Sequence, residues 1–427
     1  MARTIPDNPF AVGTLVTGDE FADRNQELRL LEDELPSGGR IFLLAYRRYG
    51  KSCLIHEALR RLRKNAGAIT AYVDLYKASS EREFWELMIN QLVGASREPV
   101  QRVTEWLKSL GGALRPTFSV DPQTGMPTVT LGSVATSAEL SRLRERALAL
   151  PAEIATRRRR PVIVAFDEFQ EIREFDGGRL EKQMRAAFQQ HRRVGYVFAG
   201  SKPHLLRRMA EDPRAAFYRF GRRLELGPIA VDAWLEYLEP RFDKGNLDVS
   251  ADALRRVVEL TRGIPYYVIR LCRLLWPGAL RRQAFDAADV DAAYGEIVDE
   301  AGAIFVPIWE ELTLAQRRTA GALAKGRGNE IFAGSVRTDY ELGAPSSVAR
   351  SLERLRDLGL VGQEGQAAGK ARYVIVDPVF AEWVRRHRVG DRARSEAATI
   401  TPASEGQFRS KRTRRRRKMR PSRKRTA

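Results

Sequence analysis

The sequence predicts an α/β protein built around a parallel sheet flanked by helices. An all-α segment and a small domain of three helices and a hairpin follow it. Apolar runs of strand length, such as 41–45 and 162–166, lack the alternation of a half-exposed strand and are separated by amphipathic helical patterns. This combination is typical of a parallel sheet buried on both faces. After residue 230 the strand-like runs give way to helical periodicity, and a hairpin pattern returns only near residue 360.

Length and composition indicate several domains. At 427 residues the chain exceeds what one hydrophobic core usually supports. The two cysteines lack metal-like spacing, and the N-terminus has no apolar signal segment, so we expect a reduced, cytoplasmic setting. The apolar runs are much shorter than the roughly 20 residues that span a bilayer, so no membrane association is expected.

The positive charge is concentrated at the C-terminal end. The formal net charge is +19, and twelve Lys or Arg residues and no acid lie between Arg409 and Ala427. We expect the segment 391–427 to be a disordered basic tail, because like charges repel one another. Binding to a phosphate backbone would release many counterions, which favours nucleic acid as a partner. A merely solubilising tail is the alternative.

The first chemical motif joins a strand to a helix. The apolar run 41–45 opens into a loop that ends in Gly50-Lys51-Ser52 and leads directly into a helical pattern. This is the arrangement of a phosphate-binding loop, in which backbone N–H groups and the positive helix end face the phosphates. Lys51 would reach the β- and γ-phosphate oxygens and Ser52 would hold Mg²⁺, with Tyr49, Gly50 and Cys53 completing the ATP-binding loop. The pattern asks for glycine at position 45, where this chain has Ala45.

The second motif is a pair of carboxylates at the end of a buried strand. The run 162–166 is followed by Asp167 and Glu168. Parallel sheets bind ligands at the carboxyl ends of their strands, so both side chains should face the phosphate loop. Asp167 is the predicted Mg²⁺ residue, and Glu168 is predicted to orient and polarise the attacking water.

The C-terminal half contains two further segments. Residues 231–306 have helical periodicity throughout and are predicted to form an all-α segment after a core of residues 1–230, which carries the phosphate loop and a hairpin insertion at about 96–136. Residues 307–390 are predicted to form a winged helix-turn-helix domain, whose third helix and wing suit DNA. Binding to protein, or simple capping of a domain, is the alternative. The candidate DNA contacts are Ser347, Arg350, Ser351 and Arg354 on the helix and Lys370 and Arg372 on the wing.

Six short motifs follow one another along the chain: Phe21-x-x-Arg24-x-x-Glu27, Arg47-Arg48-Tyr49-Gly50-Lys51-Ser52, Phe166-Asp167-Glu168-Phe169, Ala199-Gly200-Ser201, Gly263-Ile264-Pro265 and Asp377-Pro378 followed by an aromatic residue. With these motifs the chain resembles the archaeal-type ATPase family, in the STAND clade of AAA+-related P-loop proteins. The resemblance makes residues 231–306 the helical lid on a nucleotide-binding core of residues 1–230. The resemblance extends over roughly residues 8–388 in the order typical of the family. It implies ATP-dependent conformational switching, often in DNA-associated or signalling roles.

The resemblance also implies roles that the residues alone leave open. An apolar turn, here Val16 and Gly18, would lie against the adenine base, and Ser201 would sense the γ-phosphate. One arginine would reach the site of a neighbouring subunit in a homo-oligomer, although surface ion pairs are the alternative. The candidates for this arginine finger are Arg219, Arg222 and Arg223.

One expected residue is absent. Many AAA+ lids carry a sensor-2 arginine just after the Gly-x-Pro, where this chain has Tyr266 and Tyr267. Arg262 and Arg270 are the substitutes that the sequence offers.

The sequence therefore predicts an ATP-binding, slowly hydrolysing switch with ATP and Mg²⁺ as cofactors. Its nucleotide state would reorient the winged helix, on or near DNA. The predicted catalytic residues are Lys51, Glu168 and Ser201. The alternatives are a DNA-binding regulator stabilised by nucleotide with negligible turnover, and a scaffold that contacts a protein partner.

Overall fold

The structure is a computed structural model that describes residues 7–97, 102, 105, 117–120, 127–130, 136–176, 178–364 and 371–387. The predicted basic tail, Lys370 and most of the predicted insertion lie outside these residues. Within the described part of the chain, no helix combines the length and apolar character needed to cross a membrane.

A five-stranded parallel sheet forms the centre of the N-terminal half. Its strand order is β2-β5-β6-β1-β7, so the strand before the phosphate loop, β1, lies between β6 and β7. The strand before Asp167, β5, lies between β2 and β6. All carboxyl ends therefore meet at one edge. The strands are β1 (Arg40–Ala45), β2 (Ile69–Asp74), β5 (Val162–Asp167), β6 (Val194–Gly200) and β7 (Arg222–Leu226).

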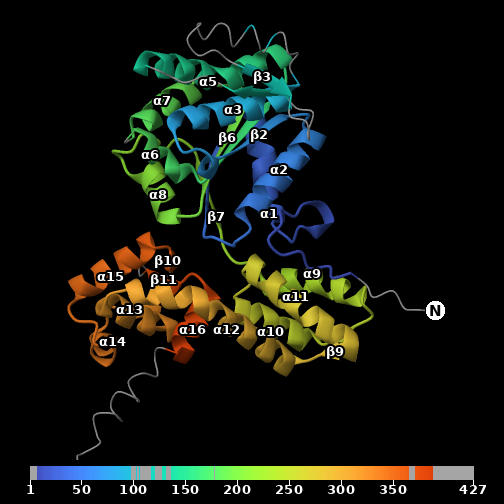
Figure 1. The fold of residues 1–427 in the computed structure, drawn as a ribbon, viewed down its shortest axis with the longest axis vertical. Coiled ribbons are helices and arrows are strands. Elements are labelled where there is room, and N and C mark those ends of the chain that lie inside the picture. Colours follow the sequence, from blue (N-terminus) through green and yellow to red (C-terminus); the bar gives the residue numbers. More distant parts are fainter. Residues whose placement is uncertain are drawn as a thin grey trace, which may run out of the picture.

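Helices cover both faces of this sheet (Figure 1). Successive residues of β1 point to opposite faces, as the period of two in a strand requires: Ile41 and Leu43 pack in one core, Phe42 and Leu44 in the other. The first face packs against α1 (Asn25–Glu34) and α2 (Lys51–Asn65). The second packs against α3 (Glu81–Ser96), α5 (Ser137–Arg158), α7 (Arg179–Phe188) and α8 (Pro203–Glu211). This confirms the predicted α/β class.

Two described strands belong to the predicted insertion. β3 (Thr117–Val120) and β4 (Pro127–Thr130) pair antiparallel, as the hairpin pattern predicted. Between Asp167 and α7 lies a short helix, α6 (Arg173–Asp176).

The segment after residue 230 is mainly helical, but the prediction that it is entirely helical is wrong. The two-residue strands β8 (Asp248–Val249) and β9 (Ala284–Phe285) pair in parallel beside the helices. Such short pairings have no periodicity that a sequence pattern could reveal. The helices are α9 (Val231–Asp243), α10 (Ala251–Thr261), α11 (Pro265–Arg282) and α12 (Ala287–Glu311). The predicted boundary at residues 306 and 307 falls inside α12.

The C-terminal segment has the predicted arrangement of helices and hairpin, drawn in orange and red in Figure 1. Strands β10 (Val361–Glu364) and β11 (Arg372–Ile375) pair antiparallel to form the wing. The helices are α13 (Leu314–Ala324), α14 (Gly334–Asp339), α15 (Pro345–Asp357) and α16 (Pro378–His387).

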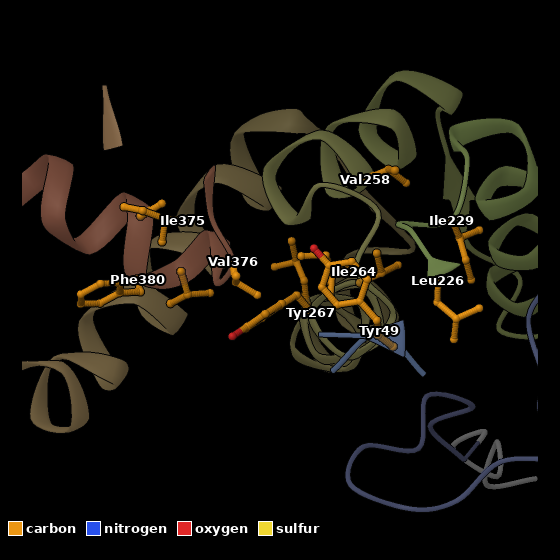
Figure 2. Close-up of a cluster of buried hydrophobic side chains, with 14 of the residues drawn as sticks. Tyr49, Leu226, Ile229, Val258, Ile264, Tyr267, Ile375, Val376 and Phe380 are labelled. Carbon is orange, nitrogen blue, oxygen red and sulfur yellow. The ribbon is translucent and has the colours of Figure 1, made fainter. Parts of the chain in front are cut away.

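One hydrophobic core joins the three parts of the chain. Figure 2 shows Tyr49 of the phosphate loop in the same buried cluster as Ile264 and Tyr267 of the helical segment. Val376, just before α16, and Phe380, in its first turn, continue this cluster. The phosphate loop therefore lies where the core, the helical segment and the winged helix meet.

Candidate nucleotide site

The phosphate loop turns sharply between β1 and α2. Gly50 precedes α2 with a φ of +83°, a left-handed conformation that glycine adopts without steric cost. A cavity of about 320 Å³ adjoins the loop. It is lined by loop residues 46–53, by Glu168 and Ser201 at the sheet edge, and by Pro265 and Tyr266 of α11.

Lys51 and Ser52, which line this cavity, contact the predicted magnesium residue, Asp167. The Lys51 ammonium forms an ion pair with Asp167 and lies 3.2 Å from Glu168 Oε1. The Ser52 hydroxyl donates a hydrogen bond of 2.9 Å to Asp167 Oδ2, and Tyr72 donates one of 2.6 Å to the same oxygen. The motifs predicted the first four residues, whereas Tyr72, which comes from β2, was missed.

These side chains fit a magnesium ion. Mg²⁺ prefers oxygen ligands and usually takes only one or two from the protein, with water and substrate phosphates completing its shell. Ser52 Oγ and Asp167 Oδ2, already 2.9 Å apart, form a pair of this kind beside the cavity.

Three hydrogen bonds to one carboxylate oxygen hold the side chain of Glu168, the residue after Asp167. Its Oε2 accepts from the Ser201 amide at 3.0 Å, the Ser201 hydroxyl at 2.8 Å and Gln170 Nε2 at 2.6 Å. Burial alone would raise the pKa of Glu168, but Lys51 and these donors outweigh it and lower the pKa below its usual value. The carboxylate is therefore ionised at neutral pH, and Glu168 lines the cavity.

The predicted base-side turn is only partly at the cavity. Val16 lines it, and so do Phe21 and Arg24 of the same motif. Gly18 does not, and its amide donates a hydrogen bond of 3.0 Å to the buried Glu57 of α2.

Arg24 has a position that its motif did not reveal. It is buried and donates hydrogen bonds to the carbonyls of Tyr49, at 3.4 Å, and Gly227, at 2.6 Å. It thus ties the phosphate loop to the end of β7. Gln170, the partner of Glu168, was also missed, since a residue two positions after a motif has no signature of its own.

The three arginine-finger candidates lie on or beside the edge strand β7, and none lines the cavity. Arg222 pairs with Glu34 at 2.6 Å, and Arg223 pairs with Glu211 and with Glu225. Arg219 lies over the Tyr218 ring at 5.2 Å. The ion pairs match the alternative that the sequence left open, and a finger role remains a prediction.

The sensor-2 substitutes are also directed away from the cavity. Arg262 donates a hydrogen bond of 2.8 Å to the carbonyl of Ile375, and Arg270 pairs with Glu300 at 2.8 Å. Neither is among the residues that line the cavity.

Comparison with known proteins gives a family for one segment and a fold for the chain. Residues 303–386 match the family described as "Probable winged helix domain". No curated protein matches the sequence. A Walker-type ATPase of Pyrococcus abyssi has a similar structure, with a TM-score of 0.58 and 22% identity, over 88% of this chain and 99% of that one. The chain has the fold of a Walker-type ATPase.

A second solved structure agrees with this result. The ORC2 protein of Aeropyrum pernix, described as ADPNP–ADP complexes, matches with a TM-score of 0.52 and 16% identity, over 87% of this chain and 93% of that one. Both similarities extend over the Walker-type core and the segment that follows it. They confirm, at the level of the fold, the architecture expected from the motifs.

Within the winged helix of this Walker-type fold, the candidate DNA residues separate into two groups. Arg350 and Arg354 are exposed on α15, and Arg372 is exposed on β11, while Ser347 is half-buried. The expectation that Ser351 points outward is wrong, since it is 5% exposed on the inner face of α15. Lys370 lies outside the described residues.

Proposed function

We propose that this protein binds Mg-ATP in the cavity beside the phosphate loop and hydrolyses it slowly, as a switch that acts on or near DNA. One observation carries the proposal. Lys51, Ser52, Asp167, Glu168 and Ser201 come from three separate stretches of the sequence, and their polar atoms converge at one sheet edge. The ORC2 protein of similar fold was solved as complexes with ADPNP and ADP, which supports a nucleotide as the ligand of this site.

The first step of the proposed reaction is an exchange of partners by Lys51. Its ammonium is now paired with Asp167 and Glu168. ATP would offer the ammonium phosphate oxygens instead, and Asp167 would become free to hold Mg²⁺ together with Ser52. The metal would neutralise charge that develops on the β- and γ-phosphates.

The second step is the attack of water on the γ-phosphorus. Glu168 would accept a hydrogen bond from the water and orient it, while the bond from the γ-phosphorus to the bridging β-oxygen breaks. Ser201 would keep the Glu168 carboxylate at the correct angle through its amide and hydroxyl. Positioning and charge stabilisation, rather than covalent chemistry, account for catalysis of this kind.

Steady-state ATP turnover by wild type and Glu168→Gln tests this proposal. We expect the variant to bind ATP and to turn it over roughly a hundredfold more slowly or worse, because the water loses its base. Glu174→Gln, a change at an exposed residue of α6, is the control and should keep wild-type turnover. Equal turnover in wild type and Glu168→Gln would refute the catalytic role. If the wild type binds ATP but shows no measurable turnover, the alternative is favoured: a DNA-binding regulator that nucleotide only stabilises.

The DNA part of the proposal rests on the surface of α15. Arg350 and Arg354 are exposed, and their side chains have no hydrogen-bond or ion-pair partner among the described residues. The exposed arginines of β7, by contrast, are neutralised by carboxylates. Unpaired arginines on the third helix of a winged helix suit the major groove and its flanking phosphates.

Binding of duplex DNA by Arg350→Ala and Arg354→Ala tests this part. At about 0.2 M salt, where contacts by the basic tail are largely screened, each change should weaken binding roughly tenfold. Arg29→Ala, an exposed arginine of α1, should have no effect. If all three variants bind DNA like the wild type, α15 does not contact DNA, and a protein partner becomes the better hypothesis.

A further inference from the structure

The first half of the phosphate loop contacts the winged helix as well as the core. The Tyr46 hydroxyl accepts a hydrogen bond of 3.0 Å from the amide of Gln363 in β10. Next to it, a Cβ atom added to Gly362 would lie 2.6 Å from the Tyr46 ring. Tyr46 therefore contacts the wing where only glycine leaves room for it.

Arg48 makes a second connection. Its guanidinium pairs with the Asp377 carboxylate and donates to the Tyr267 hydroxyl. It also lies 5.0 Å and 5.1 Å above the rings of Tyr266 and Tyr267, distances at which a cation is attracted to an aromatic face. The Arg48 side chain therefore contacts one residue of the winged helix and two of the helical segment.

The backbone of Arg48 shows why these partners are needed. Its φ is +74°, in the left-handed region that a residue with a Cβ enters only at an energetic cost. A loop residue keeps such a conformation where the surrounding structure enforces it, and these residues are frequent at ligand sites. The contacts of Arg48 supply that enforcement.

Asp377 divides its two oxygens between the two segments it joins. Oδ1 accepts hydrogen bonds from the amides of Val379, at 2.9 Å, and Phe380, at 3.1 Å, and so caps the start of α16. Oδ2 accepts from Arg48. The same carboxylate therefore begins a helix of the winged helix and holds the phosphate loop.

We propose that Asp377 and Gly362 are positioning residues of the nucleotide site. They keep Arg48 and Tyr46 in the conformation in which the loop receives the phosphates. This inference rests on the proposed function, since it requires the cavity to bind nucleotide. A loop that is already ordered loses less entropy when its ligand binds, so these contacts raise the affinity for ATP. By linkage, bound ATP must strengthen the attachment of the winged helix to the loop.

Substitution of Asp377 by Asn gives a clean test, because asparagine caps a helix as well as aspartate does but cannot form the ion pair. The Arg48 and Asp377 side chains are 44% and 19% exposed, so solvent screens the pair in part. We expect the Kd for Mg-ATP to rise about tenfold, the usual size for one charge-assisted hydrogen bond. Thermal unfolding without nucleotide should stay close to that of the wild type. Gly362→Ala, which displaces Tyr46, should also weaken binding.

The control is Glu341→Gln, which removes an ion pair with Arg318 inside the winged-helix segment. Neither residue lines the cavity, so the change should leave the Kd unchanged. Because Asp377 acts through Arg48, the double variant Arg48→Gln/Asp377→Asn should bind no more weakly than Arg48→Gln. Wild-type affinity in Asp377→Asn, or losses that multiply in the double variant, would overturn the inference. A wild type that binds no Mg-ATP would overturn the proposed function as well, so the two failures are distinguishable.

Discussion

The two halves of the phosphate loop are supported in different ways. The second half, from Gly50 to Ser52, faces the carboxylates at the edge of its own sheet. The first half, from Tyr46 to Tyr49, packs against the helical segment and the winged helix. Local motifs specify the second half, whereas the docking of distant segments holds the first. We therefore expect the second half to decide whether ATP binds, and the first half to decide how tightly.

The largest effect should come from the second half. Lys51→Ala removes the cation that faces the phosphates and leaves Asp167 and Glu168 as buried, uncompensated carboxylates. Affinity for Mg-ATP should fall at least a hundredfold, about 3 kcal/mol, and the ATP-induced rise in Tm should disappear. Differential scanning calorimetry with and without ATP measures this shift. A shift of wild-type size in Lys51→Ala would mean that ATP binds elsewhere.

The effect of Asp377→Asn, about tenfold in affinity, should be intermediate. A loss as large as that of Lys51→Ala would mean that the first half also contacts the nucleotide. Both halves of the loop would then be nucleotide-binding elements.

The smallest effect on the affinity for ATP should come from Glu57, a buried residue that contacts neither half of the loop. Glu57 of α2 is fully buried, accepts hydrogen bonds from Arg60 and Arg61, and holds the Gly18 amide. Glu57→Gln should lower the free energy of unfolding by about 1–3 kcal/mol at pH 7, with little change in the Kd for ATP.

The stability contributed by Glu57 should also depend on pH. Mainly because of the hydrogen bonds from Arg60, the pKa of Glu57 is lowered from 4.5 to about 2 in the folded protein. Its contribution is then complete above about pH 4.5 and is lost as the pH falls toward 2. Urea unfolding of wild type and Glu57→Gln between pH 7 and pH 3 should show a difference that shrinks below pH 4.5. A constant difference would contradict this role.

The sequence allowed the core of the site to be predicted because the strands are parallel. Their carboxyl ends share one edge, so the residues after three strand-like runs, Ser52, Asp167 and Ser201, had to lie near one another. Tyr72, Gln170 and Arg24 have no comparable signal. The contacts of Tyr46 and Arg48 depend on how the winged helix docks, which no local pattern encodes.

One expectation about α15 was wrong for a reason that the sequence contains. Ser351 follows Val348 by three residues and precedes Leu355 by four, which places it on the apolar face, where it is 5% exposed. The prediction followed residue type, because serine is usually exposed, whereas helical spacing places this position on the buried face.

Hydrogen exchange of the full chain with saturating Mg-ATP tests directly whether ATP binding engages the winged helix. Exchange should slow in two places at once: the phosphate loop with the first turn of α2, and the wing with the start of α16. Protection of the loop alone would show that ATP binds without engaging the winged helix. Unchanged exchange at residues 46–54 would contradict the claim that this cavity is the ATP site.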